Sequence, residues 1–149
     1  MILWRISNHV SLKGDGGTRA SGRWHTRGRR VVYCSESPAA AQLEILVHFE
    51  IDIRDLPAKY RLLKLEGPGD LAIEHAAVAD LSADWIEQAD VTRAVGDRWL
   101  QTARSPLLRV PSAVVPETFN ALLNPAHLDA TRLTVVQVSE HVIDPRLLK

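Results

Sequence analysis

The order of strand-like and helix-like segments is the feature of this 149-residue chain that most constrains its fold. Apolar and β-branched runs between turn residues predict strands at residues 2–6, 31–35, 61–65, 107–110, 114–115 and 134–138. Helices are predicted at residues 38–49 and 92–104, and residues 70–90 give mixed strand and loop signals. Because strands and helices do not alternate regularly, the pattern favours an α+β domain over a doubly wound parallel sheet.

Both predicted helices have recognisable start signals. Ser37 is a favourable N-cap, and Pro38 suits the first helical position because its fixed φ is already helical and its missing N–H costs nothing there. Thr92 is expected to cap the second helix, in which Val95 and Trp99 repeat on one face. The first helix is therefore the firmest local prediction of the chain.

Residues 7–30, called the glycine segment below, separate the first two predicted strands. The segment holds five of the eight glycines of the chain among polar residues, and it shows no apolar period. Such a composition predicts a long loop. Loops of this length inside a compact domain are usually functional or disordered.

Charge and hydropathy exclude several classes of function. The chain carries 18 Lys and Arg against 18 Asp and Glu, so it lacks the basic excess that drives direct contact with nucleic acid. No window approaches 18 uninterrupted apolar residues, and the first residues lack the pattern of a secretory leader. We therefore expect a cytoplasmic protein that has no contact with a membrane.

The cysteine and histidines predict neither a disulfide nor a metal site. Cys34 is the single cysteine and lies in an apolar run, which favours a small buried side chain over a nucleophile. The six histidines form no i, i+4 pair and have no cysteine partner. No metal or other cofactor is expected.

Glu44 is the most informative candidate residue, because it places a carboxylate inside an apolar helical stretch. Leu43 and Ile45 flank it, and alanines lie one turn earlier. Carboxylates in such surroundings are rare unless they are paired or functional. The alternative is that Glu44 faces solvent and pairs weakly with His48 one turn later.

Arg23 and Tyr33 are candidates for substrate contact. Arg23 follows Gly22, so a phosphate has room to approach its fork of N–H donors. The alternative is a solvated basic loop, since four further arginines lie nearby. Tyr33 lies in the second predicted strand, where it is either a core residue or an aromatic platform for a ligand.

Ser112 and Asn120 are the remaining candidates. Ser112 follows Pro111 and either belongs to a site or starts a turn. Asn120 has the same turn-or-cap alternative, as have Asn124 and His127.

Taken in order, these segments resemble the RES family, which is named for an arginine, a glutamate and a serine. The resemblance covers nearly the whole chain, and the order and spacing of its segments are more specific than any one of them. The similar stretches are residues 4–6 (WRI), 14–17 (GDGG), 21–25 (SGRWH), 32–33 (VY), 37–38 (SP), 43–48 (LEILVH), 110–116 (VPSAVVP) and 123–127 (LNPAH).

The resemblance assigns roles to particular residues. It matches Arg23, Glu44 and Ser112 to the three name-giving residues, Tyr33 to a tyrosine of the same pocket and Arg5 to a further arginine on the first strand.

Asn120 matches a family asparagine that is commonly followed by tyrosine, whereas Ala121 follows it here. Any ligand contact from that tyrosine is therefore missing in this chain, and Asn120 itself is kept as a substrate-binding candidate.

The resemblance also implies a fold, an activity and a partner. Residues 1–149 would form a single RES domain related to the ADP-ribosyltransferases, with twisted, mostly antiparallel sheets and a few helices. The protein would be the toxin of a type II toxin–antitoxin system that consumes NAD⁺ as its substrate. Its antitoxin would carry an Xre-like helix-turn-helix domain, and any contact with DNA would run through that partner.

A site of this kind would break the nicotinamide–ribose bond through a transition state that resembles an oxocarbenium ion. Glu44 would accept a hydrogen bond from the ribose 2′-hydroxyl. Arg23, together with Arg5, would hold the diphosphate, and Tyr33 would offer its ring to the nicotinamide. Ser112 would hydrogen-bond the carboxamide or the ribose.

The residues leave the acceptor of the reaction open. Water would give hydrolysis of NAD⁺, phosphate would give phosphorolysis, and a protein side chain would give ADP-ribosylation of a cellular target. Two readings without catalysis also stay open: a module that binds a nucleotide without turnover, and a purely structural partner protein.

Overall fold

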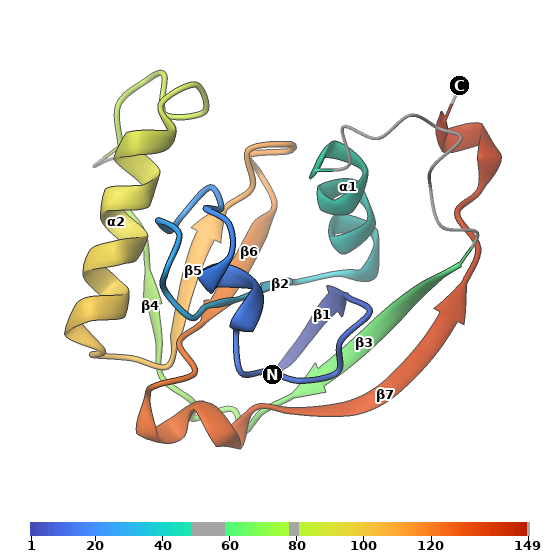
Figure 1. The fold of residues 1–149 in the computed structure, drawn as a ribbon, viewed down its shortest axis with the longest axis horizontal. Helices are drawn as coiled ribbons and strands as arrows, with labels where there is room; N and C mark the ends of the chain where they lie inside the picture. The colour runs from blue at the N-terminus through green and yellow to red at the C-terminus, as the bar shows by residue number, and fades with distance from the viewer. Residues whose placement is uncertain (49–58, 78–80, 149) are drawn as a thin grey trace.

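A seven-stranded sheet runs through the part of the chain that the computed structural model describes, namely residues 1–48, 59–77 and 81–148. The strand order is β4-β5-β6-β2-β1-β3-β7 (Figure 1). β4 and β5 run parallel, and every other neighbouring pair is antiparallel. The strands are β1 (Ile2–Ile6), β2 (Val32–Ser35), β3 (Tyr60–Glu66), β4 (Ile73–His75), β5 (Leu107–Pro111), β6 (Phe119–Leu123) and β7 (Thr134–His141).

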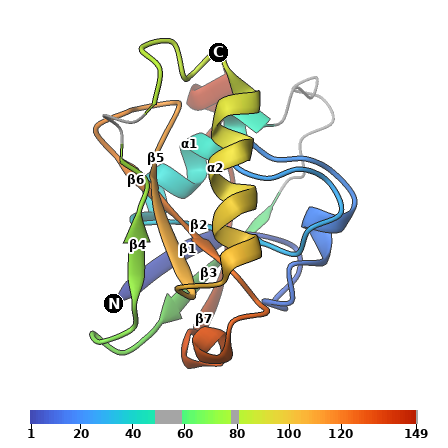
Figure 2. The ribbon, with the colours of Figure 1, turned by 90° about the vertical axis from the view of Figure 1, so that its left-hand side faces the viewer.

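Within these described ranges two α-helices accompany the sheet, α1 (Pro38–His48) and α2 (Ala89–Thr102). They stand on either side of the glycine segment in Figure 1, and Figure 2 shows α2 running along β5. Short 3₁₀ turns are η1 (Asp15–Thr18), η4 (Leu128–Arg132) and η5 (Pro145–Leu148). No helix of the described residues is long and apolar enough to cross a membrane. The predicted α+β class with a mostly antiparallel sheet is confirmed.

The central strands are buried on both faces. Successive side chains of a strand point to opposite sides, so Leu107 of β5 and Leu123 of β6 enter one core cluster, while Leu108 and Leu122 enter another. The second cluster lies under α2 and also contains Trp99 of that helix. Burial on both faces explains the consecutive leucines Leu107–Leu108 in β5 and Leu122–Leu123 in β6.

The start of α1 follows the local signals in the sequence. Ser37 Oγ accepts a hydrogen bond from the N–H of Ala40 at 3.0 Å, and Pro38 is the first helical residue. The N-cap prediction is confirmed. The helix is described as far as His48, and the predicted last residue, Phe49, lies outside the described residues.

The start of α2 differs from the prediction. The helix begins at Ala89, so Thr92 is an interior residue and not its cap. The Thr92 hydroxyl is buried and lies within hydrogen-bond distance of the carbonyl oxygens of Ala89 (3.1 Å) and Arg23 (2.5 Å). A tertiary contact to the glycine segment, and not a cap, therefore accounts for this threonine.

Two other predictions about the C-terminal half are corrected. Val114 and Val115 belong to a turn and not to a strand, because Thr118 N–H donates to the carbonyl of Val115 at 2.8 Å and closes the chain back on itself. Asn120 lies inside β6, which the sequence analysis did not predict. A polar residue close to prolines and asparagines in the sequence also fits a turn, and only its pairing partners in the sheet show that it lies in a strand.

Cys34 is buried in the first core cluster, as predicted. Burial raises the pKa of its thiol to about 11, although the charge of Arg5 acts in the opposite direction. The side chain is therefore a protonated, small apolar group.

Candidate active site

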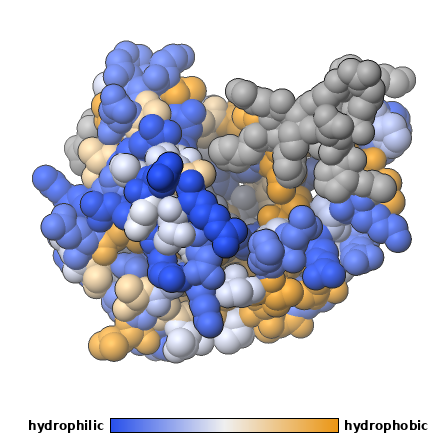
Figure 3. Space-filling model, in the orientation of Figure 1, coloured by the Kyte–Doolittle hydropathy of each residue, from blue (hydrophilic) through white to orange (hydrophobic). Residues whose placement is uncertain are grey.

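Two adjoining pockets lie where β1 and β2 separate. These strands pair only at Trp4 and Ser35, so they diverge beyond that pair. The larger pocket, about 450 Å³, is lined mainly by the glycine segment, and the smaller, about 290 Å³, lies against α1. Arg5 and Tyr33 line both. Figure 3 shows a hollow on this face, bordered by the polar surface of the glycine segment.

Glu44 lines the smaller pocket with a half-buried carboxylate. Its Oε1 accepts hydrogen bonds from Ser112 Oγ at 2.5 Å and from Asn120 Nδ2 at 2.8 Å. Two donors on one carboxylate oxygen hold the side chain in a single orientation and stabilise its negative charge.

Ser112 has only one way to direct its hydroxyl hydrogen. Its Oγ accepts the backbone N–H groups of Val114 at 3.1 Å and Val115 at 3.3 Å, so the hydrogen is left to point at Glu44. Only 2% of Ser112 is exposed. The residue therefore forms a turn and supports Glu44 at the same time, which joins the two readings that the sequence left open.

Asn120 is held from its other side by Ser35. The Ser35 hydroxyl donates to Asn120 Oδ1 at 2.8 Å, and the two residues are direct partners in the β2–β6 ladder. Because a carboxylate only accepts hydrogen bonds, the NH₂ end of the amide faces Glu44. Ser35, Asn120 and Glu44 thus form a chain of hydrogen bonds along the pocket wall.

Arg5 lies at the junction of the two pockets. Its Nη1 donates to the Tyr33 carbonyl at 3.0 Å, while its buried Nε has no partner among the described residues. Burial lowers the pKa of the guanidinium, with the Cys34 thiol acting in the opposite direction. A cation with an unmet donor beside a pocket is a favourable contact for an anion.

Tyr33 contributes its ring to the pockets while its hydroxyl is used elsewhere. The hydroxyl lies 3.1 Å from the backbone N of Trp24 and 2.7 Å from Nδ1 of His25. Burial raises the pKa of this phenol above its ordinary value. Tyr33 therefore presents a neutral aromatic ring to both pockets and also packs against the core cluster under α2.

Arg23 lines the larger pocket, on the far side of the Arg5–Tyr33 junction from Glu44. One of its nitrogens, Nη1, donates to the carbonyl of Ile86 at 2.7 Å. Among the described residues, no hydrogen bond is found for the other guanidinium nitrogens of Arg23, so they are available to a ligand. The structure thus places Arg23 and Glu44 in neighbouring pockets and not in contact.

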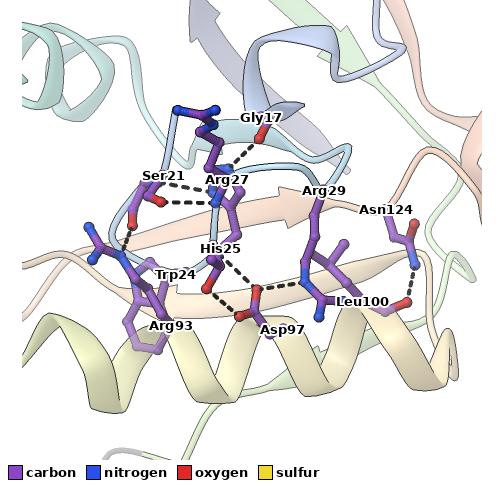
Figure 4. A network of polar contacts seen from close by, with 12 residues as sticks. Gly17, Ser21, Trp24, His25, Arg27, Arg29, Arg93, Asp97, Leu100 and Asn124 are labelled. Atoms are coloured by element: carbon purple, nitrogen blue, oxygen red, sulfur yellow. Dashed lines mark hydrogen bonds and ion pairs between the residues drawn. The ribbon is translucent and has the colours of Figure 1, made fainter. Parts of the chain in front are cut away.

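One face of α2 holds the loop that carries Arg23 (Figure 4). Arg93 Nε donates to the carbonyl of Gly22 at 2.8 Å. Asp97 accepts the N–H and the hydroxyl of Thr26 at 2.9 and 2.6 Å, and it forms an ion pair with Arg29 at 3.3 Å. These contacts fix the end of the glycine segment to a rigid element.

The sequence analysis assigned no role to several of these residues. Ser35, Arg93 and Asp97 were missed, and His25 was noted only as part of a motif. Polar residues recurring at one-turn spacing on α2 were the available signal for the helix face. Within the described ranges no group of three or more His, Cys, Asp or Glu residues could hold a metal ion.

Comparisons with known proteins agree with this fold. The family model for the RES domain matches residues 2–144. The protein "Toxin Res" of Pseudomonas putida is 46% identical over 147 residues, which cover 99% of each chain. The "Prs ADP-ribosylating toxin" of Sphingobium sp. is 34% identical over 99% of this chain and 96% of its own length.

A solved structure shows the same fold. The crystal structure of the M. tuberculosis MbcT–MbcA toxin–antitoxin complex contains a chain that matches with a TM-score of 0.77 at 20% identity, covering 98% of this chain and 85% of that one. The family model, the relatives and this structure together define the class of protein. The chain belongs to the RES-domain family of toxins.

Proposed function

We propose that this chain is the toxin of a toxin–antitoxin pair and that it degrades NAD⁺ by breaking the bond between nicotinamide and ribose. The observation that carries the proposal is the geometry of Glu44. Its carboxylate is oriented by Ser112 and Asn120 and lines a pocket shared with Arg5, whose buried Nε has no partner among the described residues. A fixed negative charge next to an anion-binding junction matches a substrate with a cationic ring and a diphosphate.

Glu44 would act on the transition state. Positive charge develops on the ribose as nicotinamide leaves, and a hydrogen bond from the 2′-hydroxyl to Glu44 strengthens as the ring becomes cationic. Because Ser112 and Asn120 already hold Oε1, the carboxylate needs no reorganisation during the reaction. Ser112 then works through Glu44, which differs from the direct substrate contact expected from the resemblance.

The other residues would bind and orient the substrate. Arg5 and Arg23 line the larger pocket, and both would contact the diphosphate with charge-assisted hydrogen bonds. Tyr33 would place its ring against the nicotinamide or ribose at the junction of the pockets. No metal or bound cofactor enters the proposal, because nicotinamide is cationic in NAD⁺ and leaves as a neutral molecule.

The acceptor of the ribosyl group distinguishes two candidate functions. Water or phosphate would give breakdown of NAD⁺, whereas a protein side chain would give ADP-ribosylation of a target. The second candidate is favoured by one comparison, since the Sphingobium relative is named an ADP-ribosylating toxin.

The proposed partner is an antitoxin with an Xre-like helix-turn-helix domain. A solved structure with the same fold is a toxin–antitoxin complex, which supports a partner of that kind. An antitoxin is also required by the proposed activity, because unrestrained loss of NAD⁺ would arrest the cell that makes the toxin.

Identifying the product tests the proposal. The purified chain is incubated with NAD⁺ in four mixtures, with and without phosphate and with and without cell lysate. Free ADP-ribose would identify hydrolysis, a phosphorylated ADP-ribose would identify phosphorolysis, and ADP-ribose attached to protein would identify transfer. Intact NAD⁺ in all four mixtures would contradict the proposal and would favour a binding module without turnover.

A further inference from the structure

His25 is a fully buried histidine for which the proposed reaction has no use. It is 2% exposed and belongs to the glycine segment. Its Nε2 lies 3.1 Å from the carbonyl oxygen of Gly17 and 3.0 Å from that of Ala20 (the former contact is drawn in Figure 4). Carbonyl oxygens only accept hydrogen bonds, so Nε2 carries the ring proton and donates.

The other ring nitrogen completes one fixed hydrogen-bond arrangement. Nδ1 accepts the N–H of Gly22 at 3.2 Å and therefore carries no proton. The Tyr33 hydroxyl, 2.7 Å from Nδ1, must then donate to it, and the same hydroxyl accepts the N–H of Trp24 at 3.1 Å. The N–H of Gly22 is shared between Nδ1 and the carbonyl oxygen of His25, which lies 3.1 Å away.

The glycines next to this network are required by its close packing. A Cβ atom on Gly22 would lie 2.4 Å from the Tyr33 hydroxyl oxygen and 2.9 Å from His25 Nδ1. A Cβ atom on Gly17 would lie 2.3 Å from the carbonyl oxygen of Arg29 and 3.2 Å from His25 Nε2. The backbone thus approaches the two rings as closely as only glycine permits.

These contacts replace strand pairing in a stretch that lies outside the sheet. Residues 17–24 belong to no strand, yet three of their backbone groups meet His25 and a fourth meets Tyr33. The same stretch contributes Arg19 and Arg23 to the larger pocket. The shape of that pocket therefore depends on the side chains of His25 and Tyr33.

We propose that His25 is a positioning residue of the active site: through its two ring nitrogens it holds the glycine segment and Tyr33 together, so that the larger pocket is preformed before substrate binds. The part of this inference that concerns turnover rests on the proposed function. A preformed pocket lowers the ordering cost of binding. Removing His25 should therefore weaken binding of NAD⁺ more than it slows the chemistry at Glu44, which lies outside this network.

Trypsin provides a test that does not depend on activity. The glycine segment offers cleavage sites after Arg19, Arg23 and Arg27, and cleavage requires the segment to open locally. His25→Ala leaves several buried groups unpaired, so cleavage of the folded chain at these sites should become roughly tenfold to a hundredfold faster. His25→Gln keeps a distal N–H donor but has no acceptor at the position of Nδ1, and its cleavage rate should lie between those of His25→Ala and the unaltered chain.

A double substitution tests whether His25 and Tyr33 act as one unit. If they do, His25→Ala with Tyr33→Phe should open the segment little more than the stronger single substitution does. His141→Gln is the matched control, because His141 is an exposed histidine on the edge strand β7 that lines neither of the two pockets, and the substitution should leave cleavage and turnover unchanged.

Kinetics separate positioning from a general structural role. The His25 variants should raise KM for NAD⁺ by roughly tenfold while kcat stays within about threefold. An unchanged cleavage rate together with an unchanged KM in the His25→Ala chain would overturn the proposal. A lower kcat and a lower melting temperature with an unchanged KM would overturn it as well. If His25→Ala does not fold, His25→Gln and Tyr33→Phe carry the same test. If the unaltered chain leaves NAD⁺ intact, the proposed function fails, while the trypsin comparison still decides the role of His25.

Discussion

At the scale of single residues, the candidate site depends on how a few polar groups orient one another. Glu44 is the central example, because its two donors come from positions 68 and 76 residues further along the chain. An apolar helical context indicated a carboxylate with partners, and the structure supplies those partners in Ser112 and Asn120. The side chain of His48, the alternative partner, lies outside the described residues.

Replacing Glu44 by glutamine should affect catalysis much more than folding. Glutamine keeps an oxygen that accepts from Ser112 and Asn120, but it lacks the negative charge that opposes the developing oxocarbenium ion. We expect kcat for NAD⁺ to fall by roughly 10²–10³-fold, which is typical for the loss of one preorganised electrostatic group. The measurement is turnover at saturating NAD⁺, with thermal unfolding to show that the variant is folded.

Arg23→Ala is the matched comparison for this prediction. It removes a binding contact in the neighbouring pocket, so KM should rise together with any loss in kcat. A folded Glu44→Gln chain whose turnover stays within about twofold of normal, as expected for loss of a surface ion pair, would remove Glu44 from the mechanism.

At the scale of elements, α2 acts as a support for the glycine segment. Thr92, Arg93 and Asp97 bind its backbone or side chains, and Gly96 lies between them on the same face. A Cβ atom on Gly96 would lie only 1.6 Å from the carbonyl oxygen of Trp24. The helix and the loop are therefore in backbone contact at this point.

Gly96→Ala should destabilise the protein although alanine is the better helix former. Intrinsic propensity favours alanine by about 1 kcal/mol, but the clash forces α2 away from the glycine segment. Overpacking of this kind costs about 1–3 kcal/mol, so we expect a net loss of unfolding free energy in urea and a higher KM for NAD⁺. The experiment compares both quantities with those of the unaltered chain.

Gly69→Ala is the control for this substitution. Nothing lies within 4 Å of a Cβ atom at Gly69, so stability should change by no more than about 0.5 kcal/mol. A Gly96→Ala chain that is more stable than the unaltered protein would contradict the close contact between α2 and the loop.

At the scale of the whole molecule, the two pockets open beside surfaces contributed by distant parts of the chain. The glycine segment borders the larger pocket and α1 borders the smaller one. This opening is therefore the place where a partner would block access to the site most directly.

The cognate antitoxin should compete with NAD⁺ for this opening. If it covers the cleft between the glycine segment and α1, the apparent dissociation constant of the complex should rise as NAD⁺ is added, and the complex should lose NAD⁺-degrading activity. Titration of the Glu44→Gln chain with antitoxin, at several NAD⁺ concentrations, measures this without consuming the substrate. A complex that degrades NAD⁺ as fast as the free toxin would show that the antitoxin binds elsewhere.

The sequence alone determined the helices and strands whose signals come from residues close together in the chain. Ser37 and Pro38 specify the start of α1, and the apolar run at Leu107 specifies β5, because capping and β propensity act over a few residues. The α+β class follows from the order of such segments. The residues matched through the family resemblance also lie in or beside the two pockets.

Only the tertiary structure decided how these parts meet. The sequence left Asn120 as a substrate-binding candidate with a turn or cap as the alternative, whereas pairing of β6 with β2 and β5 places it opposite Ser35 and within reach of Glu44. The network around His25 likewise depends on the close approach of a loop to Tyr33. Contacts between residues far apart in the chain are set by strand order and packing, which no local pattern of residues contains.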